Sequence, residues 1–428
     1  MKQIILKVTS LFILLLTPSF FTLGNVNDNY QTDLLYYVAP DSKGSGTGLT
    51  EANAADFLND SFWSLIKSQL TTKSIKIQFL DGKYLRAYTV KALKLASIGN
   101  STHKLILSGS PNVVFNAPSN LNLATKSNLI NIASSQNITI ENIHFTGNGK
   151  LNYVLQIRYQ STKNILVDNC SWIDMRGVVY GATGCHNGAN NVTYKNCTFK
   201  RIGATSGAHM IYNAYDPSRI FVFDCLFEDC PGDYVRFRDN ANQCIVANST
   251  FRRNFIISYL EKGGFIAMPV FNDVNPGDEF FATNYSFYNN QFINNSALTP
   301  VDNAFTFYSS GYTPPNYEYL LTKAEGTQLT SGTDAEKIKI LKSNFGIDVA
   351  KIRLFNNTFT GSIKNKFSIT SVANYGSVSK GWTGTANTES LIPISETPFT
   401  WEPTFASSTN NTKYDRSMIF EKVYSIPK

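Results

Sequence analysis

The sequence contains little charge and few histidines. Charged residues make up 16% of its 428 residues, and only four residues are His. Hydrophobic residues reach 43%, so the chain has the apolar material for a core, and general disorder is excluded. The formal net charge of +7 is mild and spread along the chain, which argues against a nucleic-acid-binding protein. This charge would suit an acidic polysaccharide, although a solvated basic surface is the commoner explanation.

Signals for a zinc site or a membrane span are also missing. The six cysteines form no CxxC motif, and no Cys/His pair has the spacing of zinc ligands. No apolar run reaches the length of a membrane-spanning helix. Residues 1–24 are typical of a signal peptide, because Lys2 and Lys7 precede an apolar run at 11–16 and small residues at 22–24. We therefore expect a secreted or periplasmic protein that is soluble and monomeric.

The chain is instead rich in aromatic residues, with 30 Phe and 22 Tyr, which favours strands over helices. A short pattern recurs in it: Asn (once Asp), two variable residues and an aromatic residue. Its copies lie at 142–145, 169–172, 196–199, 224–227, 248–251, 289–292 and 356–359. The first five are separated by 27, 27, 28 and 24 residues, and each follows a strand-like segment. Such a coil predicts one rung of an all-β solenoid, a single-stranded right-handed parallel β-helix with rungs stacked about 4.8 Å apart.

Each position of the pattern has a physical interpretation. Asn tolerates the left-handed conformation, so the Asn column predicts a sharp turn whose side chains form a ladder along the axis. The aromatic column predicts a stack of rings inside the solenoid. Cys170, Cys197 and Cys225 occupy one column, and we expect buried free thiols there rather than disulfides.

A helix is expected to cap the first rung. Apolar residues recur at helical spacing between 57 and 70, and Asn53 precedes them as an N-cap. Such a helix would cover the open end of the solenoid, whose exposed edge otherwise invites aggregation. Strands are predicted to resume at 75–79 and 105–107.

The β-helix is expected to span residues 25–375. The repeat is interrupted near 263–285 and 295–350, which predicts insertions there. Insertions on solenoids often border the binding groove. Residues 376–428 lack the pattern and are expected to form an irregular C-terminal cover.

The densest polar cluster falls between the third and sixth copies of the pattern. Tyr212 and Arg236 each stand twelve residues before the polar residue of a copy, so they should lie on neighbouring rungs. Arg238 and Lys262 each follow an aromatic residue of the pattern by eleven positions and should share a column. Apolar residues alternate with the two arginines, which predicts that both arginines point outward. Two outward arginines repel each other unless an anion or a carboxylate lies between them.

The candidate site residues fall into two groups. Side chains expected to stabilise charge or transfer protons are Arg238, Tyr212, His209 and Lys262. Side chains expected to bind substrate are Arg236, Tyr234, Asp239, Tyr259 and Glu261. His209 leaves two alternatives open, because strict alternation points it inward with Ile211, whereas a bend before Met210 turns it outward. Asp233, Asp239 or Glu261 could also serve as a structural partner of the arginines.

Several segments resemble one family of proteins. The solenoid as a whole looks like the pectate-lyase-type β-helices. The segment Phe237-Arg-Asp-Asn240, followed by Ile245-Val246, Asn248 and Phe251, is similar to the catalytic-arginine rung of the polysaccharide lyases that include chondroitinase B and alginate lyases. The opening Tyr36-Tyr-Val-Ala-Pro40 and the turn Leu80-Asp-Gly-Lys-Tyr84 also look like that family.

This resemblance implies β-elimination on an anionic polysaccharide that contains uronic acid. The carboxylate is neutralised, a base removes the C5 proton, and the glycosidic oxygen leaves with help from an acid. Arg238 matches the family's arginine, but the family's lysine belongs where this sequence has Tyr212-Asn213, so Tyr212, His209 or Lys262 would replace it. The acidic calcium ligands expected just upstream are missing from 205–209, so no cofactor is expected, and calcium stays open only as a less favoured alternative.

Two other functions stay open. A β-helical glycoside hydrolase needs two carboxylates that face one groove, and its candidates are Asp216, Asp233, Asp239 and Glu261. A non-catalytic glycan-binding surface protein would have flat, repetitive outer columns, and the polar cluster argues against it. Mixing the protein with polyuronate distinguishes lyase from hydrolase, because only elimination produces a conjugated double bond.

Overall fold

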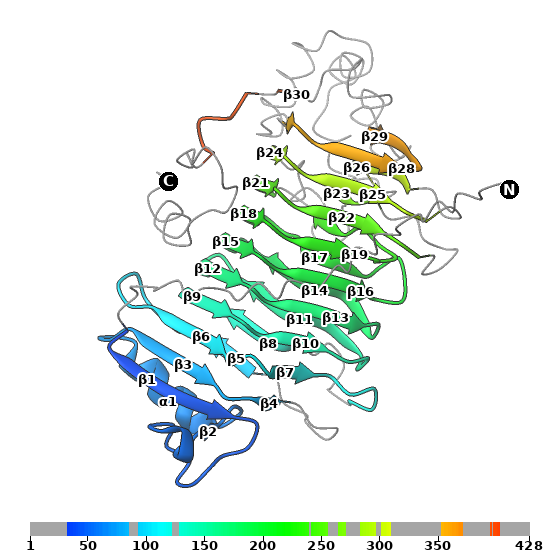
Figure 1. Cartoon of the computed structure of the whole chain (residues 1–428). Coiled ribbons are helices and arrows are strands. Elements are labelled where there is room, and N and C mark those ends of the chain that lie inside the picture. Colours follow the sequence, from blue (N-terminus) through cyan, green and yellow to red (C-terminus); the bar gives the residue numbers. More distant parts are fainter. Residues whose placement is uncertain are drawn as a thin grey trace, which may run out of the picture. The chain divides into compact units, whose positions relative to one another are not determined.

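Three parallel sheets wind around one core in the computed structural model of this chain (Figure 1). The model describes residues 32–84, 93–121, 128–238, 241–255, 264–270, 283–296, 301–309, 352–370, 394–395 and 397–402. Strands of one sheet come from successive rungs and pair in parallel, as Phe145, Trp172 and Phe199 do. The fold is a right-handed parallel β-helix, as the repeat predicts. The expected signal peptide lies outside the described residues.

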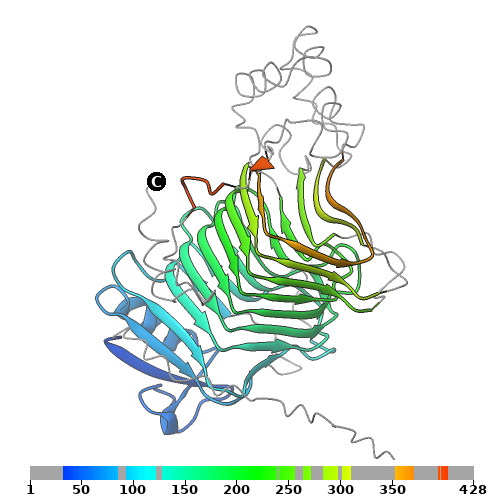
Figure 2. The ribbon, with the colours of Figure 1, turned by 45° about the horizontal axis from the view of Figure 1, so that its top comes forward.

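Each sheet takes one strand from each turn of the coil, so that strands lie one above another along the axis (Figure 2). Sheet A contains β1 (Leu34–Ala39), β2 (Ala55–Asp56), β3 (Ile75–Phe79), β6 (Leu105–Gly109), β9 (Gln136–Glu141), β12 (Lys163–Asp168), β15 (Asn190–Lys195), β18 (Ser218–Phe223), β21 (Asn242–Ala247), β24 (Thr283–Tyr288), β27 (Ile352–Phe355) and β30 (Ile394–Ser395). Sheet B contains β4 (Gly82–Lys83), β7 (Val113–Asn116), β10 (His144–Thr146), β13 (Ser171–Met175), β16 (Thr198–Ile202), β19 (Leu226–Glu228), β22 (Thr250–Arg253), β25 (Gln291–Asn294) and β28 (Thr358–Gly361). Sheet C contains β5 (Leu93–Ala96), β8 (Asn128–Ala133), β11 (Leu151–Arg158), β14 (Val178–His186), β17 (His209–Asn213), β20 (Val235–Phe237), β23 (Ile266–Val270), β26 (Val301–Ser309) and β29 (Ile363–Thr370).

The recurring Asn lies at the corner between sheets A and B. Asn142, Asn169 and Asn196 have φ values of 56°, 49° and 53°, in the left-handed region that Asn tolerates. The Nδ2 of Asn169 donates to the Oδ1 of Asn142 at 2.7 Å, and Asn356 donates in the same way to Asn289 at 3.0 Å. The predicted turn and the predicted ladder are both confirmed.

The aromatic residues of the pattern stack inside the solenoid. Ring centroids lie 5.1 Å apart for Phe145 and Trp172, 4.6 Å for Trp172 and Phe199, and 5.0 Å for Phe199 and Phe227. Phe251 continues the stack at 4.6 Å from Phe227. All five rings are buried. Because each ring covers the next, one continuous core runs along the axis, which confirms the prediction.

The cysteine column is also confirmed. Cys170, Cys197 and Cys225 are buried and unpaired, as are the other three cysteines. The Sγ of each lies 3.2–3.4 Å from the backbone carbonyl oxygen two residues earlier. Burial, and next the neighbouring Cys197 thiol, raise the pKa of Cys170 and Cys225 well above the usual value. These thiols therefore act as small core residues.

A second ladder, which the repeat does not predict, lies where the chain enters sheet A. Asn137, Asn164 and Asn191 have φ values of 58°, 60° and 53°. Asn164 donates to the Oδ1 of Asn137 and Asn191 to the Oδ1 of Asn164, each at 3.2 Å. Later rungs place Arg219 and Gln243 in the same left-handed conformation. The residue type changes along this column, so a search for a repeated letter misses it.

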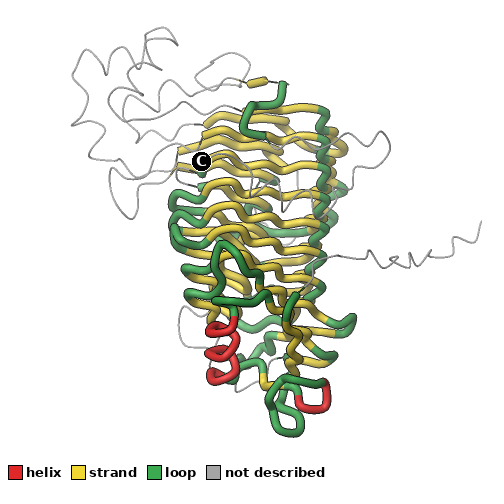
Figure 3. Tube along the Cα trace, turned by 90° about the vertical axis from the view of Figure 1, so that its left-hand side faces the viewer, coloured by secondary structure: helices red, strands yellow, loops and turns green. Residues whose placement is uncertain are grey.

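The helix α1 (Asp60–Gln69) lies at the N-terminal end of the coil (Figure 3). The Oδ1 of Asn59 accepts a hydrogen bond from the backbone N–H of Phe62 at 3.1 Å and caps the helix. The helix therefore begins later than predicted, and Asn53 instead ends the short 3₁₀ helix η1 (Glu51–Asn53). The reason is that β2 first pairs with β1, which keeps the intervening chain extended. The helix buries Phe62, Trp63 and Ile66 against the core.

Two strands lie inside the ranges where insertions are expected. β23 pairs with β20, and β26 pairs with β23, so the coil continues through parts of 263–285 and 295–350. The Asn-x-x-aromatic pattern marks only the corner between sheets A and B. It contains no information on sheet C, which is why these two strands are not predicted.

Residues 397–402, inside the range expected as a C-terminal cover, pack on the outer face of sheet A. Trp401 packs against an outward cluster that includes Phe221 and Ile245. The Oε2 of Glu402 accepts a hydrogen bond from Arg353 Nη1 at 2.8 Å. The rest of the expected cover lies mostly outside the described residues. In the described part of the chain, no helix has the length and apolarity needed to cross a membrane.

Candidate active site

The described residues of the predicted polar cluster lie in or next to β17 and β20 of sheet C. The neighbouring strands of this sheet, β14 and β11, are labelled with β17 in Figure 1. Tyr212 and Arg236 pair directly in register, as the position counting predicts. Backbone N–H of Arg238 donates to the carbonyl oxygen of Asn213 at 2.8 Å, which keeps the next outward arginine on the neighbouring rung. The parallel register therefore holds a phenol and two guanidinium groups together.

An irregularity in β17 decides where His209 points. The N–H groups of Met210 and Ile211 both donate to the carbonyl oxygen of Tyr234, at 3.1 and 3.0 Å. The chain bends at this point, and the side chains of both residues enter the core. His209 therefore lies on the outer face with Tyr212, and its ring centroid is 4.9 Å from that of Tyr212. Of the two alternatives left open by the sequence, the bend before Met210 is the correct one.

The hydrogen bonds of His209 fix its tautomer. Its Nδ1 lies 3.0 Å from the carbonyl oxygen of Asp233, which can only accept, so Nδ1 carries the proton. Its Nε2 lies 2.7 Å from Nη1 of Arg236, which can only donate, so Nε2 is the acceptor. Burial, and then the Arg236 charge, lower the pKa of His209 well below its usual value. His209 is therefore a neutral imidazole that holds Arg236.

Asp233 partly balances the charge of Arg236. Its Oδ2 lies 3.9 Å from the Nε of Arg236, and its Oδ1 accepts a hydrogen bond from the backbone N–H of Gly264 at 3.0 Å. Burial raises the pKa of Asp233, while the Arg236 charge opposes that change. Asp233 therefore acts as the structural partner that the sequence left open among three carboxylates.

Tyr212 contacts both arginines and is half-buried. Its hydroxyl oxygen accepts a hydrogen bond from Nη1 of Arg238 at 3.0 Å. The guanidinium carbon of Arg236 lies 5.3 Å from the centre of its ring. The side chain is half-buried, whereas His209 beside it is fully buried. Arg238 thus contacts the phenol oxygen, and Arg236 lies over the ring.

Arg238 points outward, as predicted, but it is only 5% exposed. Its guanidinium carbon lies 5.0 Å from the ring centre of Tyr215, which itself adopts a left-handed conformation with φ of 62°. The phenol of Tyr212 lies at the other end of the same guanidinium group. Arg238 is therefore held in place by two tyrosines, and the sequence predicted only one of them.

Two aromatic residues complete the cluster and were not predicted as site residues. Tyr153 of β11 and His186 of β14 have ring centroids 4.8 Å apart, and both lie within 6.3 Å of Tyr212. Burial lowers the pKa of His186 to about 3, with smaller contributions from the charges of Arg158 and Arg238. Burial also raises the pKa of Tyr153 well above its usual value. Both side chains therefore stay uncharged.

Two glycines of β14 allow this close packing. A Cβ at Gly184 would lie 1.8 Å from the carbonyl oxygen of Tyr212, and one at Gly181 would lie 2.8 Å from Cε1 of Tyr153. Glycine inside a strand often marks such a close approach of backbone and ring. The pair Gly181-x-x-Gly184 in a predicted strand is the sequence signal that could have identified this part of the site.

Some predicted site residues do not join the cluster. Tyr234 lies inside the solenoid, fully buried against Phe265, and its hydroxyl donates to the carbonyl oxygen of Arg252 at 2.9 Å. Tyr234 and Val235 both enter the core, as Met210 and Ile211 do on the preceding rung, so strict alternation fails there and the expected place of Tyr234 is corrected. The remaining predicted residues, Asp239, Tyr259, Glu261 and Lys262, lie outside the described residues.

Metal-ligating side chains do not gather in the described stretches. No three His, Cys, Asp or Glu side chains there come close enough together to hold an ion. At the site itself, the imidazoles of His186 and His209 face guanidinium groups, a poor environment for a cation. The described residues of the site are thus suited to binding an anion.

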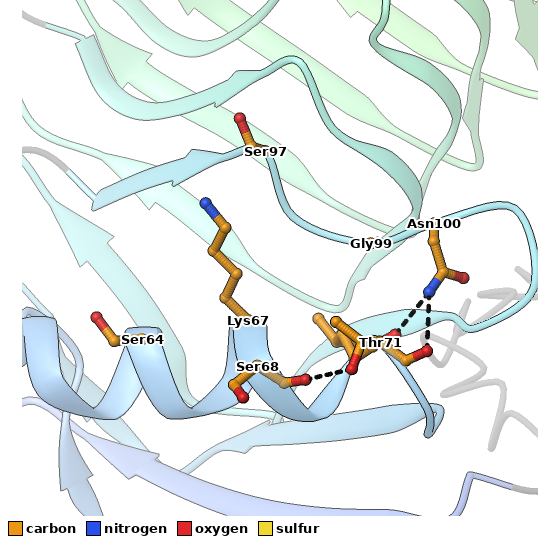
Figure 4. A pocket seen from close by; sticks show the side chains of 8 residues that line it. Ser64, Lys67, Ser68, Thr71, Ser97, Gly99 and Asn100 are labelled. Carbon is orange, nitrogen blue, oxygen red and sulfur yellow. Dashed lines mark hydrogen bonds between the residues drawn. The ribbon is translucent and has the colours of Figure 1, made fainter.

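A small pocket also lies beside the cap helix, between α1 and the segment that contains Ser97 and Asn100 (Figure 4). Asn100 Nδ2 donates to the carbonyl oxygen of Leu70 at 2.9 Å and so ties the helix to the first rungs. Hydroxyl groups and a single cation, Lys67, line this pocket. It has none of the grouped titratable side chains found on sheet C, so sheet C is the better candidate.

Comparisons with known proteins were made for sequence and for structure. No model of a protein family and no curated protein matches the sequence. Among solved structures, the chain is similar to an alginate lyase from Paenibacillus sp. str. FPU-7, with 10% identity, a TM-score of 0.41, and coverage of 77% of this chain and 99% of that chain. It is also similar to pectate lyase Pel9A, with 12% identity, a TM-score of 0.37, and coverage of 78% and 80%. A third similar structure is the GH136 lacto-N-biosidase from Eubacterium ramulus, with 12% identity, a TM-score of 0.40, and coverage of 65% and 64%.

Proposed function

We propose that this protein is an exported lyase that cleaves a uronic-acid-containing polysaccharide by β-elimination. The observation that carries the proposal is the environment of Tyr212. Its hydroxyl accepts a hydrogen bond from Arg238, Arg236 lies over its ring, and the group is accessible from the outer face of sheet C. A phenol held between two fixed cations is suited to act as a base, because the cations stabilise its deprotonated form.

The proposed reaction uses this one group twice. The phenolate oxygen of Tyr212 takes the proton from C5 of the uronate, and the electron pair of that bond forms the double bond between C4 and C5. The bond between C4 and the glycosidic oxygen breaks, and the oxygen leaves with its electron pair. That oxygen takes the proton from Tyr212, which restores the phenolate. The products are an unsaturated uronate and a new chain end.

The arginines have separate parts in this proposal. Negative charge spreads from C5 onto the carboxylate as the proton leaves, and a guanidinium group can hold both carboxylate oxygens. Arg238 donates to the hydroxyl of Tyr212, so we assign it to the phenolate and to the carboxylate of a sugar bound beside that hydroxyl. Arg236 is tied to His209 and Asp233, and we assign it to substrate orientation.

His209 is not assigned as the base. Its Nε2 lone pair already accepts a hydrogen bond from Arg236 at 2.7 Å, and its Nδ1 proton is given to a backbone carbonyl. Both ring nitrogens are therefore engaged inside the protein. In this proposal His209 positions Arg236.

The experiment that tests the function follows the ultraviolet absorbance of the conjugated double bond during incubation with alginate, pectate, chondroitin and ulvan. The wild-type protein is expected to produce this absorbance with at least one polymer. Tyr212→Phe is expected to lower kcat/KM by roughly 10²–10⁴, the range for loss of a proton-transfer group.

Tyr37 of β1, which lies on sheet A, supplies a control outside the site, and Tyr37→Phe is expected to keep wild-type activity. Chain cleavage that releases reducing ends without any absorbance would overturn elimination in favour of hydrolysis. Binding of a polymer without cleavage would overturn the catalytic proposal.

A further inference from the structure

A second arginine–tyrosine pair lies on the same face of sheet C, at the end of β11. Arg158 is in register with His186, and His186 pairs with Ala214 on the next rung. Arg238 lies on the rung after that of Ala214. Its backbone N–H donates to the carbonyl oxygen of Asn213, the residue directly before Ala214. Arg158 and Arg238 therefore lie three rungs apart, on either side of His186, whose pKa both charges lower.

Arg158 has unused hydrogen-bonding capacity. Its guanidinium carbon lies 4.3 Å from the ring centre of Tyr159, and its Nη2 donates to the hydroxyl of the same tyrosine. Its Nε is buried and has no hydrogen-bond partner. No carboxylate lies within ion-pair distance of it in the described parts of the chain. The side chain as a whole is half-buried, so an anion arriving at the surface can bind the other nitrogens of the guanidinium group.

Tyr159 itself has an unfavourable backbone conformation. Its φ is 81°, in the region that favours glycine and asparagine, and the corresponding position on the next rung is Asn187 with φ of 54°. The ring is 39% exposed, so packing in the core does not explain why a bulky residue stands there. Strained backbone at an accessible aromatic residue points to a role in binding.

We infer that Arg158 and Tyr159 form a second subsite that binds a uronate carboxylate, about three rungs from the proposed site of cleavage. This inference rests on the proposed function and extends it. Three rungs correspond to about 14 Å along the axis. The bound polymer would run along the solenoid across β20, β17, β14 and β11, and at least two of its sugars would have to carry carboxylates. The subsite thus favours a polyuronate over a polymer with isolated acidic sugars.

The inference predicts an effect that depends on substrate length. With size-fractionated oligouronates of the polymer that the wild type cleaves, kcat/KM is expected to rise once the oligomer is long enough to reach Arg158. Arg158→Gln is expected to remove this rise, lowering kcat/KM by roughly tenfold for long oligomers through KM, as for loss of one charge-assisted contact. The shortest cleaved oligomers should be unaffected. An equal loss at all lengths, or no loss at any length, would overturn the subsite.

A matched control separates binding from a general charge effect. Arg201 is also an outer-face arginine, but it lies on sheet B, where it pairs with Asp174. Arg201→Gln removes the same charge and is expected to keep the wild-type length dependence. If it reproduces the effect of Arg158→Gln, the effect is long-range charge and the subsite is wrong.

Tyr159→Asn tests the strained residue with a second readout. Asn tolerates the left-handed conformation, so the melting temperature is expected to stay equal or rise, while KM for long oligomers rises. A fall in melting temperature with unchanged KM would show that Tyr159 is structural.

The failure of this inference can be told from failure of the proposed function. If the wild type releases no unsaturated product, the function is wrong, and the subsite is then judged by calorimetric binding of polygalacturonate and alginate. Weaker binding by Arg158→Gln than by Arg201→Gln supports the subsite, and equal binding overturns it.

Discussion

At the scale of single residues, the site depends on which groups stay uncharged. Burial keeps His186 and His209 neutral beside three arginines, so the positive charge of the face belongs to guanidinium groups, which remain protonated at any working pH. The hydrogen bonds of His209 are consistent only with the neutral ring. The site therefore combines fixed cations with neutral imidazoles, a suitable environment for an anionic sugar.

Arg238 is expected to be the most sensitive arginine for turnover. Its guanidinium group donates to Tyr212 and stacks on Tyr215, and a lysine ammonium cannot make both contacts. Arg238→Lys should lower kcat/KM by roughly 10² or more, on the scale of losing one charge-stabilising donor. Arg236→Lys should cost less, because Arg236 orients substrate. Near-normal turnover in Arg238→Lys, with an unchanged circular dichroism spectrum, would place the chemistry elsewhere.

The neutral His186 makes stability depend on pH. Its pKa falls from its ordinary value of 6.5 to about 3 on folding, so between these pH values the unfolded chain binds more protons than the folded one. The contribution of the neutral His186 to the free energy of unfolding is therefore complete above about pH 6.5. It is lost as the pH falls toward 3, and the free energy of unfolding then decreases by about 1.4 kcal/mol per pH unit. Urea unfolding at pH 7, 6, 5 and 4 should show a shallower loss for His186→Gln than for the wild type. Equal slopes would show that His186 is not buried in the neutral form.

At the scale of elements, the turns are more regular than the strands. The Asn ladder at the corner of sheets A and B keeps one residue type over many rungs, because the left-handed conformation and the side-chain bond both select Asn. Sheet C has no such marker, and its strands contain bulges. A strict alternation of inward and outward side chains therefore predicts Arg236 and Arg238 correctly. The same rule places Tyr234 on the wrong face and would have turned His209 inward.

The ladder can be tested at Asn169, where φ is 49° and Nδ2 donates to Asn142. Asn169→Gly loses the side-chain bond but accepts the conformation, whereas Asn169→Ala loses the bond and also bears a cost of about 1–2 kcal/mol for the left-handed backbone. Alanine should therefore destabilise more than glycine in chemical denaturation. At Asn131, inside strand β8, the order should reverse, because glycine weakens an extended strand. The same order at both positions would contradict the turn argument.

At the scale of the whole chain, the sequence predicts the coil better than the surface. The stacked columns of Phe, Trp and Asn repeat from rung to rung, so the spacing between copies of the pattern in the sequence reveals them. The candidate site is built from residues that do not repeat, such as Tyr153, His186 and the two glycines of β14. Their proximity depends on the register of four rungs and on the bend at Met210, and neither can be read from spacing alone. Tyr212, Arg236 and Arg238 were predictable because they lie at a fixed distance from the repeated pattern.

The last prediction concerns metal. Calcium-assisted elimination uses a cation to neutralise the substrate carboxylate, and the acidic ligands expected for such an ion are missing from residues 205–209. In the proposed site, Arg236 and Arg238 already supply fixed positive charge beside Tyr212. A divalent ion would have to bind among guanidinium groups that repel it. We therefore expect kcat/KM on polyuronate to be unchanged after dialysis against EDTA and unchanged on adding calcium. Complete loss of activity in EDTA that calcium restores would show that a cation, and not the arginine pair, neutralises the carboxylate.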